Sequence, residues 1–476
     1  MHLSIEEILK ATNGWLLSDN NESNLKCKIN SISINSKEVE KNALFVPLHG
    51  ERVDSHKFIN DALTNGAVAT LTDEEASDFL PCKIYIKVKS TINALQDLAK
   101  FYRNKFHIPI VGITGCVGNT SSKEMVALAL SEKFNVHKTK GNLNSQVGIP
   151  MTLFDLQEDN DVSVIEMGIS EFSEMDKLAD IVRPTFAVLT NIGVTHIENL
   201  KTQKNIMDEK LKITKNFGGD SVLFINKDDK MLSKIKNDKN YKIITFGLKS
   251  DSDFKAENIT FGNNETRFKL INKTDREESQ TMITIPSIGW HNVYSALAGL
   301  AVGQYLGVAI KDMQKAFLKY APLAKRQCLL ENVQIKKSDK KTISISIIDD
   351  TYNANPDSMI NAIDVLNMYK KEKKTRSIAV LADMLELGEA SKQLHFALGE
   401  HVAKTNVDIL VTVGQEAKSI ADEIKKHNKN VITQSFANNV DAFHFLKDNL
   451  KSGDTVLFKG SRGMHIDEII EKLLNR

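Results

Sequence analysis

Hydrophobic and polar positions alternate along this chain in three stretches of different texture. The first stretch, residues 1–104, mixes short apolar runs with one clear helical pattern. The apolar runs predict strands at 32–34, 43–48 and 67–72, and the spacing of apolar residues predicts a helix over 91–102. We therefore expect a small α/β domain at the N-terminus.

The second stretch, residues 105–322, repeats a short apolar run followed by a helical pattern. Strands are predicted at 108–114, 162–167, 186–192, 221–226 and 242–247. Such alternation is typical of a mostly parallel sheet covered by helices. The more polar stretch 252–286 is expected to form an antiparallel excursion at the edge of this sheet. A helix rich in alanine and leucine should follow at 291–306.

The third stretch, residues 323–476, shows the same alternation on a smaller scale. Strands are predicted at 344–349, 377–383, 408–414, 430–436 and 455–461. This pattern indicates a separate Rossmann-like domain. The lysine-rich stretches 336–341 and 370–376 are expected to be solvated turns between elements. The whole chain is thus predicted to be an α/β protein of three domains.

Length and composition agree with this picture and exclude some classes of function. A chain of 476 residues is too long for one ordinary domain. The 62 basic and 61 acidic residues give a formal charge of +1, which argues against nucleic-acid or membrane-surface binding through bulk charge. No apolar run reaches the ~18–20 residues that span a bilayer. The four cysteines are scattered without metal-ligand spacing, so we expect a cytoplasmic protein. For the oligomeric state, a monomer is the default expectation.

Candidate chemistry lies where the strands of the second stretch end, because open parallel sheets bind ligands at the carboxyl ends of their strands. The strand at 108–114 runs into a glycine-bearing loop that opens a helix. Such a loop points backbone N–H groups at a phosphate, and hydroxyls that follow it can hold Mg²⁺. The residues concerned are Gly115, Gly118, Asn119, Thr120 and Ser121.

Two further strand ends add a carboxylate and an imidazole. Glu166 lies at the end of the strand 162–167, and His196 follows the strand 186–192. Either residue alone is more often structural. Three types of ligand at three successive strand ends nevertheless favour a site for a nucleotide and a metal ion.

Several motifs in a fixed order give the chain a resemblance to the Mur ligases. The run 112–125 resembles the ATP loop of that family. Further family motifs follow at 139–150, 166–168, 190–198, 289–297, 348–358, 381–389 and 458–463. The blocks 352–356 and 383–388 resemble those of the branch that adds D-alanyl-D-alanine. The resemblance covers nearly the whole chain and implies a UDP-substrate domain (1–104), an ATP-binding domain (105–322) and a domain for the incoming amine (323–476).

The resemblance also implies a reaction. Mur ligases use ATP and Mg²⁺ to join a carboxylate to an amine, through an acyl phosphate that the amine then attacks. The implied substrates are UDP-N-acetylmuramoyl-tripeptide and D-alanyl-D-alanine, in the synthesis of cell-wall peptidoglycan. Metal ions that spread negative charge accelerate phosphoryl transfer of this kind.

Family roles carry over residue by residue. Thr120, Glu166 and His196 are implied as metal ligands, and Lys210 as the lysine that the family carbamylates to bridge a second metal. The spacing of its helix alone would leave Lys210 exposed. Asn292 is implied as the contact to adenine, and the nucleotide contacts from the last domain are Arg326 and Asp350.

The remaining implied contacts concern the two substrates. Ser36, Lys37, Asn144 and Ser145 correspond to contacts on the side of the UDP substrate. On the dipeptide side the corresponding residues are Tyr352, Asn353 and Asn355. Two cations beside a glycine at a strand end, Lys459 and Arg462, also suit an anion.

The most consequential departure from the family is Asn119, which stands where the phosphate loop has a lysine. A charge-assisted hydrogen bond to phosphate is worth ~1.5–3 kcal/mol. Lys123 and Arg326 are candidates to supply the missing charge. The family's Asp-Ser-Arg also reads Asn35-Ser36-Lys37, its Asp-Gly-His reads 54–56 as Asp-Ser-His, and its paired asparagines read 144–145 as Asn-Ser.

Two alternatives therefore stand beside a cell-wall ligase. The changes on the UDP-substrate side favour a paralogue that joins a different acid and amine. The missing loop lysine favours a catalytically silent, nucleotide-binding regulator. The retained residues Glu166, His196, Lys210, Asn292 and Asp350 argue against a silent protein.

Overall fold

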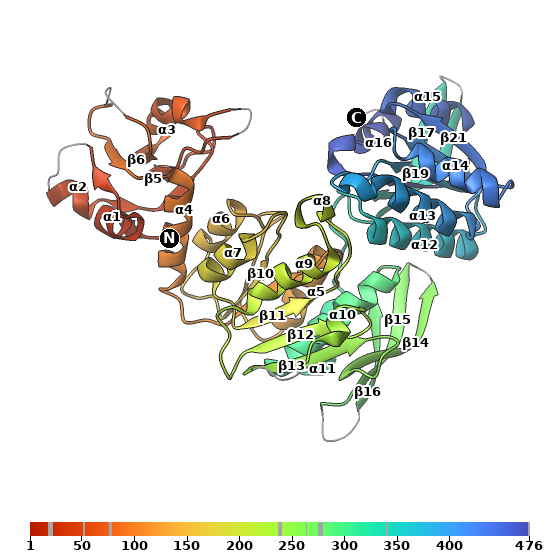
Figure 1. The fold of residues 1–476 in the computed structure, drawn as a ribbon, viewed down its shortest axis with the longest axis horizontal. Coiled ribbons are helices and arrows are strands. Elements are labelled where there is room, and N and C mark those ends of the chain that lie inside the picture. The colour runs from red at the N-terminus through yellow and green to blue at the C-terminus, as the bar shows by residue number, and fades with distance from the viewer. Residues whose placement is uncertain are drawn as a thin grey trace.

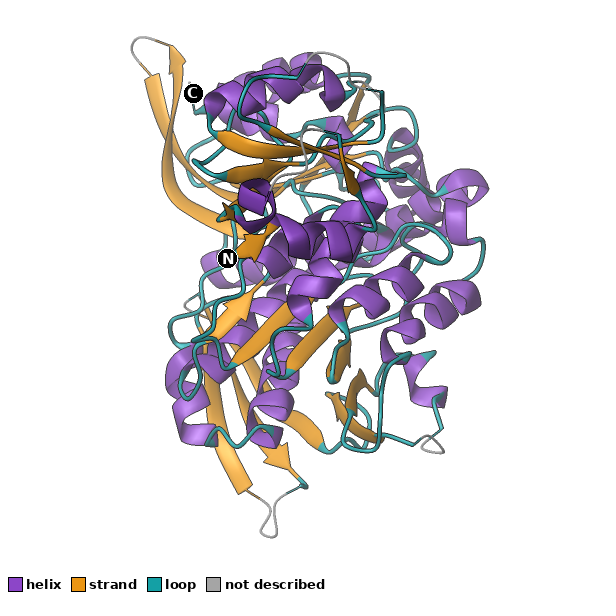
Figure 2. Ribbon diagram, turned by 90° about the vertical axis from the view of Figure 1, so that its left-hand side faces the viewer, coloured by secondary structure: helices purple, strands orange, loops and turns teal. Residues whose placement is uncertain are grey.

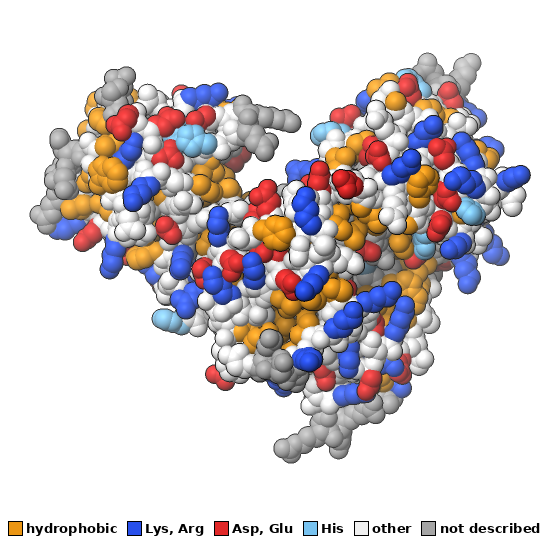
Figure 3. All heavy atoms as spheres, viewed as in Figure 1, with side chains coloured by type: hydrophobic (Ala, Val, Ile, Leu, Met, Phe, Trp, Pro, Cys, Tyr) orange, Lys and Arg blue, Asp and Glu red, His pale blue; other side chains and the backbone are white. Residues whose placement is uncertain are grey.

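Three α/β domains follow one another in the computed structural model (Figure 1). It describes residues 1–17, 22–50, 53–75, 79–236, 240–262, 264–274, 279–338 and 341–474. Each of the three segments predicted from the sequence holds its own main sheet, and the predicted α/β class is confirmed. The N-terminal and C-terminal domains flank a broad hollow above the central domain (Figure 3). No helix in the described part of the chain has the length and apolarity needed to cross a bilayer.

The N-terminal domain is a five-stranded sheet in the order β2-β7-β6-β5-β4. Its strands are β2 (Trp15–Leu16), β4 (Ser31–Ser33), β5 (Ala43–Phe45), β6 (Ala67–Thr72) and β7 (Ile84–Lys87). The helices are α1 (Ile5–Thr12), α2 (Glu22–Lys26), α3 (Ile59–Asn65) and α4 (Thr91–Arg103), and a small ladder joins β1 (Leu3–Ser4) to β3 (Lys28–Ile29). The sequence predicted β4, β5, β6 and α4 but not β7.

The central domain is a nine-stranded sheet in the order β16-β15-β14-β13-β12-β11-β8-β10-β9. Strands β9 to β14 run parallel, whereas β14, β15 and β16 pair antiparallel, as the polar stretch 252–286 predicted. The strands are β8 (Ile110–Thr114), β9 (Val136–Lys138), β10 (Val162–Glu166), β11 (Phe186–Leu189), β12 (Val222–Asn226), β13 (Lys242–Gly247), β14 (Phe254–Gly262), β15 (Glu265–Asn272) and β16 (Ser279–Ile285).

Helices cover both faces of the central sheet. Successive residues of a strand point to opposite faces, and here the residues on both faces are buried. Ile110 and Ile165 pack into one core, and their neighbours Val111 and Val164 into another. This double burial explains why the parallel strands are mainly apolar in sequence and do not alternate with polar residues. The helices are α5 (Asn119–Ser131), α6 (Gly148–Phe154), α7 (Glu174–Val182), α8 (Ile197–Leu200), α9 (Gln203–Leu211), α10 (Trp290–Tyr305) and α11 (Ile310–Phe317).

Helix α4 joins the first two domains through packing as well as through the chain. It contacts α1 on one side and α6 and α7 of the central domain on the other. The Tyr102 hydroxyl donates to the carbonyl of Leu156 at 2.8 Å, and Arg103 Nε donates to the carbonyl of Val182 at 2.9 Å. A single apolar core therefore runs from the N-terminal sheet into the central domain.

The C-terminal domain is a six-stranded sheet in the order β17-β18-β22-β19-β20-β21 with helices on both faces. Its strands are β17 (Cys328–Ser338), β18 (Lys341–Asp350), β19 (Ser377–Ala382), β20 (Ile409–Val413), β21 (Ile432–Phe436) and β22 (Thr455–Lys459). The helices are α12 (Pro356–Lys373), α13 (Ser391–Ala403), α14 (Lys418–His427), α15 (Asn439–Asn449) and α16 (Asp467–Leu473).

The prediction that the two lysine-rich stretches are turns was wrong in part. Residues 336–338 belong to β17, which forms a long hairpin with β18 (Figure 2), and residues 370–373 end α12. Residues 339–340 lie outside the described part. Lys337 extends from the strand and donates to the carbonyls of Asp448 and Leu450, so its aliphatic stem lies along the domain while its charge is satisfied.

Buried His137 in β9 is expected to make the central domain less stable in mild acid. Its Nδ1 lies 2.7 Å from the Ser163 hydroxyl, and burial lowers the pKa of His137 to about 4. An unfolded histidine titrates near ~6.5, so below that pH the unfolded chain binds a proton that the folded chain does not. The stabilisation is complete above pH ~6.5 and falls as the pH drops towards ~4, by up to about 2 kcal/mol at pH 4.5.

Urea unfolding at several pH values, followed by the fluorescence of Trp15 and Trp290, tests this. The free energy of unfolding of His137→Gln should change less between pH 7 and 4.5 than that of the natural chain. His444→Gln, at an exposed histidine of α15, is the control and should keep the natural pH dependence. Equal pH dependence in all three proteins would contradict the prediction.

Candidate active site

The carboxyl ends of the central strands face the C-terminal domain across a cleft of about 340 Å³. Residues of both domains line it, and most of the site residues predicted from the sequence are among them. These are Gly115, Gly118, Asn119, Thr120, Ser121, Asn144, Ser145, Glu166, His196, Lys210, Arg326, Asp350, Tyr352, Asn353, Asn355 and Lys459.

The loop between β8 and α5 is shaped to leave its backbone open to a ligand. Gly118, at the start of α5, has φ +81°, which favours glycine. At Gly115 a Cβ would lie only 1.9 Å from the hydroxyl oxygen of Thr190, so a larger residue does not fit. The Asn191 Oδ1 accepts the backbone N–H groups of Cys116 (3.0 Å) and Val117 (2.9 Å) and so fixes the loop.

Asn119 is tied into this loop. Its Nδ2 donates to the carbonyl of Gly115 at 2.8 Å, and its Oδ1 accepts from the hydroxyl of Thr190 at 3.0 Å. The amide therefore stabilises the loop through neutral hydrogen bonds, and this position supplies no positive charge.

The two cations proposed as replacements lie in different surroundings. Lys123 is fully buried, and its Nζ donates to the carbonyl of Thr139 at 2.9 Å. The same Nζ lies 3.9 Å from the Glu166 carboxylate. Arg326 lines the cleft, with its guanidinium carbon 3.8 Å from the centre of the Tyr352 ring. Arg326 is thus the candidate that reaches the cleft.

Glu166 presents a fixed carboxylate beside the loop. Its Oε1 accepts from Asn144 Nδ2 at 2.8 Å and from the Thr120 hydroxyl at 3.3 Å. Its Oε2 is buried and has no hydrogen-bond partner among the described residues. A carboxylate oxygen and a hydroxyl side by side are ligands that Mg²⁺ prefers, so these residues fit a divalent cation.

His196 is paired with the C-terminal domain. Its Nδ1 lies 2.5 Å from Glu386 Oε2, and this contact lowers the pKa of the Glu386 carboxyl. The backbone N–H of Glu198 also donates to the carbonyl of Glu386 at 3.4 Å. In this arrangement the loop around Glu386 docks on α8, and the pairing uses Nδ1, so a metal ion could bind the other ring nitrogen, Nε2.

Lys210 is buried at the cleft, although most residues of its helix, α9, are polar. It is 3% exposed, and burial lowers the pKa of its amine. The acidic side chains of Glu174 and Glu209 oppose this shift only in part. A lowered pKa increases the neutral fraction of the amine, which is the form that reacts with electrophiles.

The C-terminal wall is built on a buried ion pair. Asp350 and Lys459 are register partners at the ends of β18 and β22, with Lys459 Nζ 2.7 Å from Asp350 Oδ2. The same Nζ donates to the carbonyl of Asn353 at 3.0 Å. Burial raises the pKa of Asp350, and Lys459 opposes the rise. Asn355, the N-cap of α12, donates to the Thr195 hydroxyl at 3.1 Å and so bridges the two domains.

Four predicted residues lie elsewhere. Arg462 lines a neighbouring cavity of about 250 Å³, and its guanidinium carbon lies 5.6 Å from the Tyr352 ring centre. Ser36 and Lys37 line a cavity of about 660 Å³ in the N-terminal domain. Asn292 is buried in α10, where its amide donates to Ser287 and Ile288. The roles of all four remain predictions.

The sequence analysis missed several residues that line the cleft or hold the lining residues in place. Residues that directly follow the predicted strands could have been found by widening the search by a few positions, since the same strand-end rule applies. Others reach the cleft from helices and loops far away in sequence. The missed residues include Glu174, Asn191, Thr195, His291, Gln327, Ser358, Asn361 and Glu386.

Comparison with known protein families gives three matches in chain order. Residues 28–103 match "Mur ligase family, catalytic domain", and residues 113–303 match "Mur ligase middle domain". Residues 334–462 match "Mur ligase, glutamate ligase domain". Together these spans cover most of the chain.

Curated relatives match over the full length. The UDP-N-acetylmuramoyl-tripeptide–D-alanyl-D-alanine ligase of Bacillus subtilis is 31% identical, over 99% of this chain and 98% of the relative. The enzyme of the same name from Treponema pallidum is 31% identical over 100% of both chains.

Solved structures agree with these relatives. A crystal structure of MurF from Acinetobacter baumannii has a TM-score of 0.87 at 26% identity and covers 100% of this chain and 99% of that one. MurF ligase from Thermotoga maritima in complex with ADP has a TM-score of 0.79 at 28% identity, with 94% and 97% covered.

Proposed function

Since this chain belongs to the Mur ligase family, we propose that it joins D-alanyl-D-alanine to UDP-N-acetylmuramoyl-tripeptide at the expense of ATP, in peptidoglycan synthesis. Two named relatives that match from end to end support the substrates. The observation that carries the chemistry is the cleft, where a glycine loop and Glu166 of one domain meet Arg326 of the next.

The central domain supplies the phosphate side of the reaction. The backbone N–H groups of residues 118–121, where α5 begins, hold the phosphates of ATP, whereas those of Cys116 and Val117 are bound to Asn191. Thr120 and Glu166 hold Mg²⁺, with His196 and Lys210 nearby in the same cleft. The ion supplies charge stabilisation for phosphoryl transfer. Arg326 provides a cation at the same phosphates, in place of the loop lysine that Asn119 replaces.

The other two domains supply the substrates. The tripeptide carboxylate takes the γ-phosphoryl group, and the dipeptide amine then displaces phosphate to leave the amide. Ser36 and Lys37 contact the UDP part in the N-terminal cavity, and Asn144 and Ser145 contact the peptide part near Glu166. Tyr352, Asn353, Asn355, Lys459 and Arg462 form the dipeptide side. We place the reaction in the cytoplasm, with the chain acting as a monomer and without nucleic acid.

Phosphate release from ATP–Mg²⁺ tests this function. Turnover should require both UDP-N-acetylmuramoyl-tripeptide and D-alanyl-D-alanine, and omission of either should reduce it to background. Turnover with another acid or amine but not with this pair would establish a paralogue of different specificity. No turnover with any pair, but nucleotide binding intact, would establish a silent nucleotide-binding protein.

Lys210 is expected to act as its carbamate. A neutral amine adds CO₂ and releases a proton, and the lowered pKa of Lys210 increases the neutral fraction. Removing CO₂ and bicarbonate should lower kcat about tenfold or more, a loss typical when a group that tunes a bound metal is removed. Adding bicarbonate should restore it.

The matched control is Lys212→Arg, two residues along the chain, where the amine is paired with Asp176 and Glu209. It should respond to bicarbonate as the natural chain does, whereas Lys210→Arg should not respond. A rate independent of CO₂ in the natural chain would show that Lys210 acts as a free amine.

A further inference from the structure

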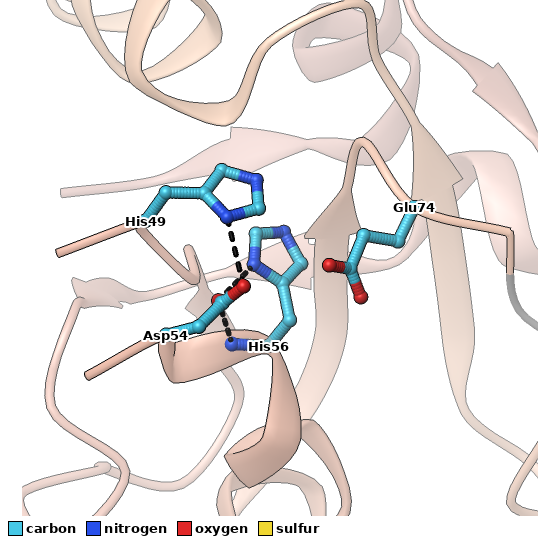
Figure 4. Close-up of side chains that lie close together, drawn as sticks. All are labelled: His49, Asp54, His56 and Glu74. Atoms are coloured by element: carbon cyan, nitrogen blue, oxygen red, sulfur yellow. Dashed lines mark hydrogen bonds and ion pairs between the residues drawn. The ribbon is translucent and has the colours of Figure 1, made fainter.

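A second cluster of ligand-type side chains lies in the N-terminal domain, outside the cleft. His49, Asp54, His56 and Glu74 each offer one ligand atom, and these atoms lie within 4.8 Å of one another (Figure 4). His49 and Asp54 form an isolated β-bridge, which brings the two ends of their loop together. His56 lies in the 3₁₀ turn Ser55–Phe58, and Glu74 follows the end of β6.

The two imidazoles of the cluster are stacked between two carboxylates. Their ring centroids are 4.3 Å apart, with the planes 25° from parallel. Asp54 lies 2.8 Å from His49 Nδ1 and 2.7 Å from His56 Nδ1. On the opposite edge, one oxygen of Asp73 lies 3.0 Å from His49 Nε2 and 2.9 Å from His56 Nε2. Every ring nitrogen of the pair therefore meets a carboxylate oxygen.

Hydrogen bonds alone do not satisfy this arrangement. A neutral imidazole has one N–H and carboxylates only accept, yet each of these rings meets a carboxylate oxygen at both nitrogens. The His56 side chain is only 3% exposed. Its Nε2 is buried and has no partner in hydrogen-bonding geometry among the described residues, although Asp73 lies close. This buried nitrogen therefore lies against a carboxylate without a hydrogen bond.

We propose that this cluster binds a divalent transition-metal ion of the Zn²⁺ class, with His49, Asp54, His56 and Glu74 as its ligands. Two imidazoles with carboxylates are typical of Zn²⁺ sites, whereas Mg²⁺ prefers oxygen alone. The ion accepts one nitrogen lone pair from each ring. Because its ligand Asp54 lies on the Nδ1 edge, the ion would take the two Nδ1 atoms, and Asp73 lies beside the two Nε2 atoms, where a carboxylate is the usual support of a metal-bound histidine.

The ion would connect three elements of the N-terminal domain. Its ligands come from the loop before α3 and from the end of β6. Asp73 beside it accepts the backbone N–H of Thr91, at the start of α4, at 3.0 Å. Val53 and Ser55, on the same loop, line the N-terminal cavity together with Ser36 and Lys37. The ion therefore fixes one wall of that cavity.

The experiment is a calorimetric titration of Zn²⁺ into the full-length chain, freed of metal by a chelator and without nucleotide. Co²⁺ in place of Zn²⁺ gives a visible absorption spectrum that reports nitrogen and oxygen ligands. We expect one ion per chain. His49→Ala should weaken binding at least about tenfold, the scale of loss when one group of a metal site is removed. His49 is half-exposed, so this variant is expected to fold.

Two controls assign the ion to this cluster. His427→Ala removes a histidine that pairs with Glu423 on the surface of the C-terminal domain and should bind Zn²⁺ as the natural chain does. His196→Ala removes the imidazole of the cleft and should also leave the site intact. The proposal is overturned if the chain binds no Zn²⁺, if His49→Ala binds it unchanged, or if the ion is lost only in His196→Ala. None of these readouts depends on ligase activity.

Discussion

The Asn119→Lys variant is expected to show a kcat/KM for ATP about ten to a hundred times that of the natural chain. The natural amide is neutral and is held by the Gly115 carbonyl and the Thr190 hydroxyl. A lysine at the start of α5 would add a positive charge beside the phosphates. A charge-assisted hydrogen bond of this kind is worth ~1.5–3 kcal/mol, and each ~1.4 kcal/mol changes a rate about tenfold.

Asn119→Gln is the matched control, because glutamine lengthens the side chain without adding charge. It should be no faster than the natural chain. If Asn119→Lys is no faster either, Arg326 already supplies the full stabilisation at the phosphates. Activity in Asn119→Lys alone, with none in the natural chain, would mean that the natural protein binds nucleotide without turning it over.

Lys459→Met is expected to destabilise the C-terminal domain by about 3–5 kcal/mol, the usual cost of leaving one partner of a buried ion pair alone. Asp350 would remain among β18 and β22 with its charge unpaired, and the carbonyl of Asn353 would lose its donor. Urea unfolding followed by circular dichroism measures the change. The double variant Asp350→Asn, Lys459→Met should recover much of the lost stability, since no charge is then buried.

Lys370→Met is the control for this prediction. Lys370 pairs with Asp408 at 2.7 Å, but both side chains are partly exposed, so the expected loss is below about 1 kcal/mol. A loss in Lys459→Met no larger than in Lys370→Met would show that Asp350 becomes protonated, or is hydrated, without a measurable penalty.

The sequence predicted best those parts of the fold in which a single local pattern, such as a run of apolar residues, determines the structure. The strands β8, β10 and β12 are buried on both faces, so each appears as a mainly apolar run that ends in a polar residue. That pattern also located the cleft, because parallel strands bring their carboxyl ends to one edge. The family resemblance then separated Lys210 from the other lysines of a polar helix.

The parts that could not be predicted depend on contacts between distant residues. Strand β17 was hidden because its lysines read as solvated, whereas Lys337 is anchored on the carbonyls of another segment. The pairing of His196 with Glu386 joins two domains across the cleft. The cluster of His49 and Glu74 exists because a strand and a loop return to one point in space, which no local spacing records.

The packing of α4 against both domains has a consequence for substrate choice. Because one apolar core extends through this helix, the N-terminal cavity and the phosphate loop are held at a set separation instead of swinging on a linker. A substrate anchored at its nucleotide end must be long enough to bring its carboxylate to Glu166 and Thr120. If the nucleotide end of the substrate binds in the N-terminal cavity, as proposed, helix α4 sets the length that the substrate needs, and an acceptor with a shorter peptide stem would bind there and fall short of the phosphate.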